Sequence, residues 1–340
     1  QTRTRDASEG MLASVGSDAA LSLFVRQTGL PELFLRDELP LAFDDAVTEF
    51  RRQIIGQDDA CRAAARLVIS FKAGMNDPAR PVGVLLFCGP TGVGKTELGR
   101  ALARYFFGAG EQSDRLIRLD MSEYTGFDAA QRLLGRPDGE PSELIRRVRA
   151  QPFCVVLLDE IEKADPDVFD MLMGLFDEGR LTDRYGRTTS FRSAIVILTS
   201  NIGSDRQKGV GFGAATGPSL ETQVQSFFRP EFYNRLDAVV TFAPLAHDVI
   251  LAITRKELDE LNRREGIARL RVQLIWNDAV VEHLAREGFD PRYGARPLQR
   301  TLERRIVAPL ARWLLEHPDV RECRVQVDVG DHGGLQFSAG

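Results

Sequence analysis

The sequence predicts an α/β fold: a central parallel sheet flanked by helices, followed by a small, mostly helical C-terminal domain with a few strands. Three observations predict it. Short apolar runs alternate with helical stretches from about residue 84 to residue 242, which is typical of a buried parallel sheet covered on both faces. A phosphate-binding glycine pattern stands between the first run and the next helical stretch. After Pro244, long helical patterns replace the short runs.

We expect residues 1–50 to form a linker and an N-terminal helical segment. The first 20 or so residues are small and polar, as linkers commonly are. From Leu21 onward the apolar residues recur at helical spacing, with an interruption at Gly29-Leu30-Pro31. The chain begins with Gln1, which is compatible with a fragment of a longer protein.

Residues 51–245 are expected to form the large domain. The alanine-rich segment Asp58–Phe71 has Leu67, Val68 and Phe71 on one helical stripe and precedes the sheet pattern. The predicted strands are Val84–Cys88, Leu116–Leu119, Val155–Leu158, Ala194–Thr199 and Ala238–Phe242. The helices predicted between them are Thr96–Phe107, Ser142–Ala150 and Pro166–Phe176.

Residues 246–340 are expected to form the small domain. Helical spacing recurs over His247–Arg264, Asp278–Glu287 and Arg296–Leu315. Apolar and polar residues then alternate over Arg324–Val329 and Leu335–Phe337, which predicts short strands.

The segment Gly89–Thr96 has the pattern G-x-x-x-x-G-K-T in the strand–loop–helix context that a phosphate loop requires. Its glycines allow backbone N–H groups to surround phosphate oxygens, and the following helix directs its positive dipole end at the same anion. Lys95 is expected to reach the β- and γ-phosphates of ATP, and the Thr96 hydroxyl to bind Mg²⁺. The candidate binding residues of this loop are Gly89, Pro90, Thr91, Gly92, Val93, Gly94, Lys95 and Thr96.

The predicted strand Val155–Leu158 ends in the acids Asp159 and Glu160. We expect Asp159 near the Mg²⁺ ion, and Glu160 to orient or deprotonate the attacking water. Acids at strand ends are common, so this pair indicates a catalytic site only because a phosphate loop precedes it in the same sheet. The two motifs together predict an ATP hydrolase that uses ATP and Mg²⁺.

Three further polar residues stand near the ends of predicted elements. Asn201 follows an apolar run, where an amide either holds the attacking water or the γ-phosphate or is simply a turn residue. Arg235 precedes a predicted strand, and Arg296 opens a predicted helix. Judged by position alone, each arginine either has a role in the site or is an ordinary solvated or salt-bridged side chain.

Composition and charge favour a globular protein in a reducing compartment. The formal net charge is −5 and the pI is about 5.6, so there is no basic footprint of the kind that binds nucleic acid. The four cysteines lie far apart without a C-x-x-C pair, which indicates neither a zinc site nor a disulfide framework. No signal peptide or bilayer-spanning run is visible, so we expect no membrane contact and a cytoplasmic location.

Taken together, the motifs resemble those of the second AAA+ module of the Clp protein-remodelling ATPases (ClpA, ClpB and ClpC), over about residues 25–337. The matching segments are IIGQ at Ile54–Gln57, GPTGVGKTEL at Gly89–Leu98, DMSEY at Asp120–Tyr124, VVLLDEIEKADPDVF from Val155, DEGRLTD from Asp177, ILTSNIGS from Ile197, FRPEFYNRLD from Phe228 and YGARPLQR from Tyr293. The fold that this resemblance implies is a P-loop AAA+ ATPase domain followed by a small helical lid domain.

The resemblance implies roles that spacing alone does not assign. Asn201 would be the sensor-one residue, and Arg296 the sensor-two arginine that touches nucleotide from the small domain. Arg235 would be the arginine finger that reaches into the ATP site of the neighbouring subunit, which requires a ring, here a homo-hexamer. Ile54, Ile55 and the sensor-two region would flank the adenine.

Three segments bear on what such an ATPase acts on. Unfoldases of this family carry a G-Y-V-G-Y-like pore loop that grips polypeptide, whereas the stretch between Leu134 and Leu144 is shorter and has no aromatic residue. Tyr185, in the region of the second pore loop, either compensates or is an ordinary turn residue. A possible peptidase-docking tripeptide, with a packed or flexible loop as its alternative, is formed by Val210, Gly211 and Phe212.

The sequence therefore predicts an ATP-dependent protein-remodelling ATPase, chaperone- or unfoldase-like, that acts as a ring on a protein substrate or through an adaptor. The alternative is a nucleotide-dependent switch or assembly module that hydrolyses ATP without threading a substrate. A nucleic-acid motor is disfavoured by the acidic balance of charge.

Overall fold

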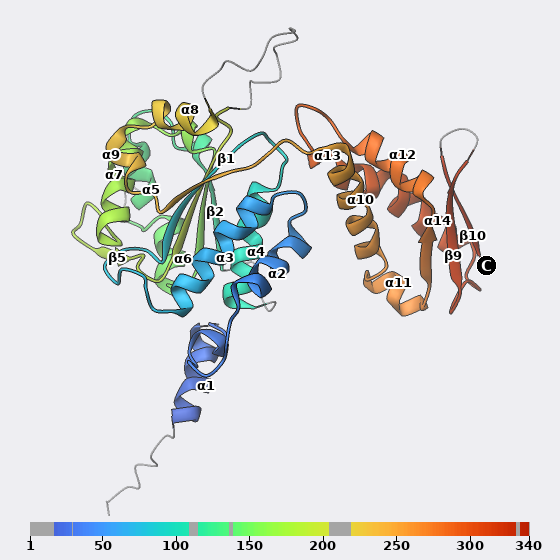
Figure 1. The fold of residues 1–340 in the computed structure, drawn as a ribbon, viewed down its shortest axis with the longest axis horizontal. Coiled ribbons are helices and arrows are strands. Elements are labelled where there is room, and N and C mark those ends of the chain that lie inside the picture. The colour runs from blue at the N-terminus through green and yellow to red at the C-terminus, as the bar shows by residue number, and fades with distance from the viewer. Residues whose placement is uncertain are drawn as a thin grey trace, which may run out of the picture.

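A large part built on a five-stranded sheet stands beside a smaller, mostly helical part, and the segment after strand β7 links them (Figure 1). This arrangement confirms the predicted fold class. The computed structural model describes residues 17–28, 30–108, 115–135, 139–203, 219–330 and 334–339.

The central sheet has the strand order β2-β3-β6-β1-β7, and all of its pairings are parallel. Its strands are β1 (Gly83–Cys88), β2 (Leu116–Asp120), β3 (Val155–Asp159), β6 (Ile195–Ser200) and β7 (Ala238–Thr241). Strands β1, β3 and β6 are buried along their whole length, which is why they read as continuous apolar runs. Parallel pairing brings the carboxyl ends of these three strands to one edge of the sheet.

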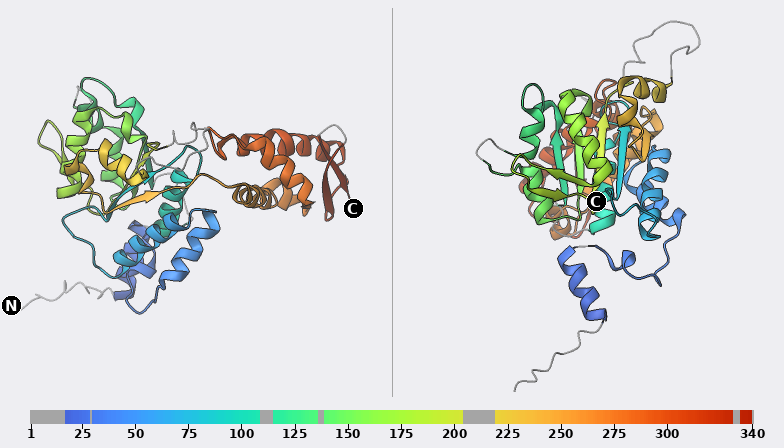
Figure 2. Two further views of the ribbon diagram at one scale, coloured as in Figure 1. Left: turned by 45° about the horizontal axis from the view of Figure 1, so that its top comes forward. Right: turned by 90° about the vertical axis from the view of Figure 1, so that its left-hand side faces the viewer.

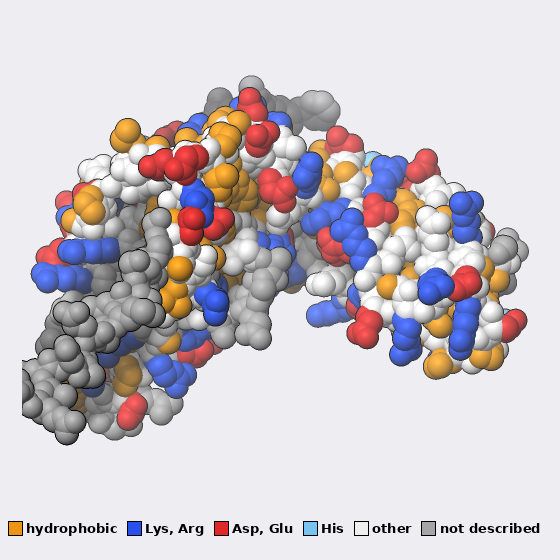
Figure 3. Space-filling view, turned by 90° about the horizontal axis from the view of Figure 1, so that it is seen from below, with side chains coloured by type: hydrophobic (Ala, Val, Ile, Leu, Met, Phe, Trp, Pro, Cys, Tyr) orange, Lys and Arg blue, Asp and Glu red, His pale blue; other side chains and the backbone are white. Residues whose placement is uncertain are grey.

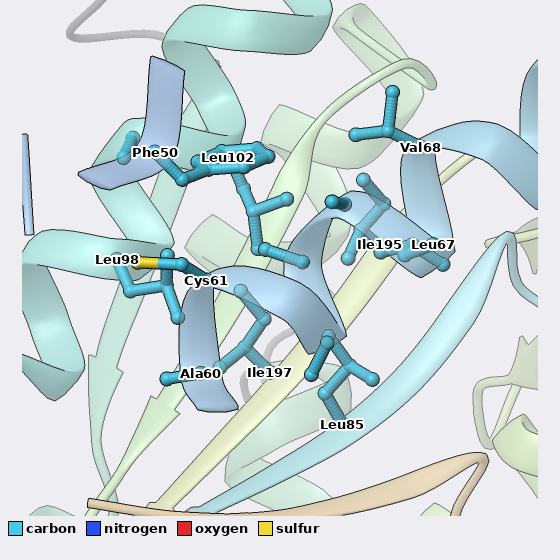
Figure 4. Close-up of a cluster of buried hydrophobic side chains, with 14 of the residues drawn as sticks. Phe50, Ala60, Cys61, Leu67, Val68, Leu85, Leu98, Leu102, Ile195 and Ile197 are labelled. Carbon is cyan, nitrogen blue, oxygen red and sulfur yellow. The ribbon is translucent and has the colours of Figure 1, made fainter. Parts of the chain in front are cut away.

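Alternate residues of the central strands feed two separate cores. Leu85 and Ile197 pack on the face that also holds Leu98 of α4, and these three side chains meet in Figure 4. Leu86 and Leu198 point to the opposite face and belong to the second core. The period of two along each strand therefore places one hydrophobic layer on each side of the sheet.

Helices cover both faces of the sheet, as the right-hand view of Figure 2 shows. The first face carries α2 (Phe43–Gln53), α3 (Asp58–Lys72) and α4 (Lys95–Phe107). The second face carries α5 (Ala129–Leu134), α6 (Glu143–Ala150), α7 (Pro166–Glu178), α8 (Leu220–Phe227) and α9 (Pro230–Tyr233). The short 3₁₀ turns are η1 (Glu32–Phe34), η3 (Met121–Glu123) and η4 (Ile161–Lys163).

The N-terminal helix α1 (Ser17–Thr28) lies outside these two layers (Figure 1). It touches the large part through the ring of Phe24, whose centroid lies 6.1 Å from that of Phe153. Arg115 adds a hydrogen bond from its side chain to the carbonyl of Thr28.

The small part has its own core and its own three-stranded sheet, of order β10-β9-β8. Strands β8 and β9 pair in parallel, and β9 and β10 pair antiparallel. Its elements are α10 (His247–Leu261), α11 (Glu265–Leu270), β8 (Gln273–Trp276), α12 (Asp278–Gly288), α13 (Arg296–Leu302), the π turn η6 (Glu303–Val307), α14 (Ala308–Glu316), β9 (Arg324–Val329) and β10 (Leu335–Ala339).

Several predicted boundaries are corrected by the structure. The helix predicted over His247–Arg264 ends at Leu261, and α11 follows as a separate short helix. The helix predicted over Arg296–Leu315 contains the π turn η6 between α13 and α14. Neither β8 nor the hairpin of β4 (Arg180–Thr182) and β5 (Thr188–Ser190) was predicted, because these short segments lack the continuous apolar run that marked the strands of the central sheet.

Two surface properties bear on the function. No helix among the described residues is long and apolar enough to cross a membrane. On the face in Figure 3, basic and acidic side chains are interspersed rather than gathered by sign.

Candidate active site

The segment between β1 and α4 forms a tight loop whose conformation requires glycine. Gly92 has a φ of 75°, and a Cβ atom on it would lie 1.9 Å from the carbonyl oxygen of Tyr293 in the small part. The Ala295 N–H donates to the Gly92 carbonyl at 3.2 Å. Backbone from the small part therefore lies directly on this loop, at a distance that no other residue type at position 92 would allow.

A cavity of about 730 Å³ lies at this edge of the sheet, between the large and the small part. It is larger than a single side chain and falls within the size range of small-molecule sites. The residues predicted from sequence that line it are Ile54, Ile55, Thr91, Gly92, Val93, Gly94, Lys95, Thr96, Asp159, Glu160, Asn201 and Arg296. Gly89 and Pro90 complete the loop behind it, where their carbonyls accept hydrogen bonds from Lys95.

Lys95 is the buried cation of the cavity, with an exposed fraction of 7%. Its ammonium group donates to Oδ1 of Asn201 at 2.8 Å and to the Pro90 carbonyl at 2.9 Å. Burial lowers the pKa of Lys95 to about 8, against the opposing effect of nearby acids, of which Glu162 is the strongest. A buried cation in a loop of backbone N–H groups is suited to binding an anion such as a triphosphate.

Asp159 ends strand β3 and is held from two sides. The Thr199 hydroxyl donates to its Oδ1, and the Arg118 guanidinium donates to its Oδ2 through Nε at 3.1 Å and through an Nη at 2.5 Å. The carboxylate is nearly buried, at 12% side-chain exposure. Its orientation is therefore defined by neighbouring strands, β6 through Thr199 and β2 through Arg118.

Glu160 follows directly, with an unusual backbone conformation. Its φ of 58° lies in the left-handed region, which turns its side chain into the cavity at a cost in strain. Its backbone N–H donates to the Thr199 hydroxyl at 3.1 Å, and its carboxylate accepts from the Asn201 amide at 3.2 Å. Lys163 pairs with the other carboxylate oxygen. These contacts therefore fix the orientation of the Glu160 side chain.

Asn201 joins the cation to the acid, because its side chain contacts both Lys95 and Glu160. Its backbone N–H donates to Oε1 of Glu162 at 3.0 Å, which fixes the residue after the end of β6. Of the two readings of Asn201 from sequence, its contacts favour the site over an ordinary turn.

The oxygens at the acid end of the cavity fit a Mg²⁺ ion bound with nucleotide. Thr96 and Asp159 both line the cavity, and hydroxyl and carboxylate oxygens are the ligands this ion prefers. Among the described residues there is no group of three or more His, Cys, Asp or Glu side chains able to hold a metal alone.

Other side chains that line the cavity come from both parts of the molecule, and several of them are aliphatic. Ile54 and Ile55 come from the segment between α2 and α3, while Leu245 and Ile253 come from the linker and α10. Arg296 approaches from the start of α13. Aliphatic side chains of this kind can pack against the flat face of a nucleotide base.

Arg235 does not line the cavity. Its guanidinium pairs with Asp177 at 2.6 Å, and its side chain is 31% exposed on the surface of the large part. Arg80 fixes the adjacent backbone by donating to the Arg235 carbonyl at 2.7 Å. In this chain Arg235 is a surface residue away from its own nucleotide cavity.

The loop with the unusual pore sequence is closed at its base by an antiparallel bridge between Gly135 and Pro141. Arg187 donates to the Gly139 carbonyl at 2.8 Å, and its guanidinium lies 5.1 Å from the ring centroid of Tyr185. Tyr185 remains 54% exposed. The peptidase-docking tripeptide, Val210 to Phe212, lies outside the described residues.

Sequence reasoning missed three residues that hold the site together: Arg118, Thr199 and Glu162. A basic residue inside the apolar run of β2 was the available signal for Arg118, because a charge on a strand usually has a partner. Thr199 and Glu162 gave no signal, since their contacts depend on which strand lies beside β3.

Comparison with known proteins agrees with this geometry. Residues 80–239 match the model of the AAA domain (Cdc48 subfamily), and residues 245–327 match the C-terminal, D2-small domain of ClpB protein. The chaperone protein ClpB of Meiothermus ruber is 42% identical over 329 residues, which cover 92% of this chain and 37% of that protein. The ATP-binding subunit ClpC of the ATP-dependent Clp protease of Staphylococcus aureus (strain USA300) is 37% identical over 352 residues, covering 98% of this chain and 42% of that protein.

A phosphate loop at the carboxyl edge of a five-stranded parallel sheet, with a small domain beside the cavity, defines the class of nucleotide-binding AAA+ ATPase domains. Within that class, the chain belongs to the Clp family, and its two matched regions correspond to a second nucleotide-binding module. The chain spans about two fifths of the length of these curated relatives.

Proposed function

We propose that this chain is the ATP-hydrolysing module of a ring-forming, protein-remodelling ATPase. The observation that supports this most is the network that joins Lys95, Asn201 and Glu160 at one cavity, with Asp159 beside it. A cation for the phosphates, an acid for the metal and an acid for water stand together there. These are the parts that phosphoryl transfer to water needs.

In this proposal, Lys95 and the loop N–H groups bind the β- and γ-phosphates, and Thr96 and Asp159 hold Mg²⁺. The ion, when bound, offsets charge on the phosphate oxygens. Glu160 accepts the proton of the attacking water, while Asn201 keeps that carboxylate and Lys95 in fixed relation. Ile54 and Ile55 would contact the base.

Two arginines complete the site in the proposal. Arg296 would bind the phosphates from the small domain, so that nucleotide state and domain closure are coupled. Arg235 would serve the neighbouring subunit in a homo-hexamer, which agrees with its surface position away from its own cavity. Head-to-tail contacts of this kind close into rings.

The candidate that competes is a nucleotide-driven switch that does not thread polypeptide. Its support is the loop between Leu134 and Leu144, which has no aromatic residue and is bridged at its base. A short closed loop gives little contact area to an arbitrary chain. Tyr185 is the exposed aromatic side chain beside it and would be the substitute grip in a threading machine.

An unfolding assay on a degradation-tagged fluorescent protein separates the two. If the chain is a remodelling ATPase, the fluorescence of the tagged substrate should fall only when ATP is present. The variant Glu160→Gln should bind ATP without hydrolysing it, so the substrate should then keep its fluorescence. ATP turnover without unfolding, and without stimulation by any added polypeptide, would favour the switch.

Further parts of the proposal follow from family membership and sequence. The domain division is 1–50 for the linker and N-terminal helical segment, 51–245 for the large domain and 246–340 for the small domain. A cytoplasmic location and a protein substrate or adaptor, without nucleic acid, complete it. Peptidase docking through Val210, Gly211 and Phe212 is a further part of the proposal.

A further inference from the structure

Arg118 is a charged residue of the nucleotide cavity to which neither motif nor family assignment gives a role. It stands in strand β2, in register with Leu157 of β3, and reaches past the strand end to Asp159. Both Nε and an Nη donate to the same oxygen, Oδ2, at 3.1 and 2.5 Å. Its side chain remains 42% exposed and lines the cavity.

From this geometry we infer that Arg118 is the resident counter-ion of Asp159, a positioning residue that lets the acid serve the metal without repelling the nucleotide. The inference rests on the proposed nucleotide site. An isolated carboxylate beside a triphosphate raises the free energy of the bound anion, because like charges in a partly buried site are weakly screened. The guanidinium offsets that charge and fixes the carboxylate, while Thr199 holds the other oxygen.

The division of the two carboxylate oxygens supports this role. Oδ2 receives two donors from Arg118, and Oδ1 receives one from Thr199. A carboxylate oxygen accepts about two hydrogen bonds, so Oδ1 keeps an acceptor site. That oxygen is therefore the one that would face the metal or a water bound to it.

A charge cycle on nucleotide binding tests the inference without any turnover. The probe is fluorescent ADP in EDTA at low salt. Its binding requires no hydrolysis, so a variant that has lost hydrolysis or remodelling can still be measured. Arg118→Ala leaves the negative charge of Asp159 without its counter-ion. This variant should bind ADP about fivefold more weakly, because one uncompensated carboxylate then repels the phosphates. Asp159→Asn leaves the guanidinium unpaired and should tighten binding by about the same factor.

The double variant Arg118→Ala/Asp159→Asn is the decisive one, because it has neither charge. Its affinity should return to within about twofold of the wild type, and Arg118→Lys should also stay close to the wild type. Arg271→Ala breaks an exposed arginine–glutamate pair with Glu322 on the small part and should leave the nucleotide affinity unchanged.

Two results would overturn the inference. One is wild-type affinity for metal-free nucleotide in Arg118→Ala. The other is a double variant that binds as weakly as Arg118→Ala, since that would mean that Arg118 supports the fold of the site rather than its charge balance.

Discussion

At the residue scale, we expect the buried Lys95 to set how nucleotide affinity depends on pH. Burial lowers its pKa to about 8, whereas a bound triphosphate requires the charged form. Raising the pH through 8 therefore deprotonates Lys95 in the nucleotide-free protein. The dissociation constant for nucleotide should then rise about tenfold between pH 7 and pH 9. Equilibrium binding of labelled nucleotide over this range measures it.

The matched control for this pH dependence is Lys95→Arg. A guanidinium stays charged throughout, so its affinity should be flat with pH even if it is weaker than that of the wild type. A wild-type affinity that is equally flat would show that Lys95 remains charged at pH 9.

The main residues of the site were predictable because their motifs are local. The phosphate loop and the pair Asp159 and Glu160 are each contiguous in sequence, and each lines the cavity. Arg118 and Thr199 were not predictable, because they reach Asp159 from neighbouring strands. The left-handed backbone at Glu160 was equally invisible, since nothing in its residue type requires it.

At the element scale, the contact between the phosphate loop and the start of α13 couples the two parts of the molecule. Gly294 has a φ of 59°, and a Cβ atom on it would lie 2.7 Å from the Gly92 carbonyl oxygen. Gly294→Ala should push this segment off the loop and weaken nucleotide binding about fivefold to tenfold, from strain and clash together. Calorimetric titration with nucleotide measures the change.

Gly266→Ala is the control for that variant, since a Cβ atom there meets nothing within 4 Å and the residue lies within α11. It should bind as the wild type does. Unchanged affinity in Gly294→Ala would mean that the small part does not need this contact to close the cavity.

The strands of the central sheet and the longer helices were largely predictable, because their period is visible, whereas the short helices α5, α8 and α11 were not predicted. The strands of the central sheet follow the continuous apolar runs, and α3, α4 and α12 follow the helical stripes. The π turn η6 was not predictable, since Glu303–Val307 keeps the composition of an ordinary helix. Sheet order also needed the structure, because pairing depends on contacts far apart in sequence.

At the scale of the whole molecule, the proposed ring depends on Arg235 acting in a neighbouring subunit. Subunits carrying Arg235→Ala and subunits carrying Glu160→Gln should each be nearly inactive alone. Mixed in equal amounts, they should regain about one quarter of wild-type turnover, because in random rings one site in four combines an intact acid with a neighbour's intact finger. Steady-state phosphate release measures this recovery.

The control mixes Arg235→Ala with a subunit carrying both substitutions, which supplies no finger and should give no recovery. Full activity of Arg235→Ala alone would contradict the assigned role, as would mixed rings that stay inactive. The position of Arg235 on the surface, paired with Asp177, agrees with a residue that serves another subunit.

The most direct test of the account is calorimetric titration of Mg·ATP into the wild type, Lys95→Ala and Arg312→Ala, an exposed arginine on α14. The account predicts saturable binding by the wild type and by Arg312→Ala. For Lys95→Ala it predicts a loss of about a hundredfold or more, because the buried cation of the phosphate loop is gone. Equal affinity in all three proteins would contradict the assignment of this cavity to nucleotide.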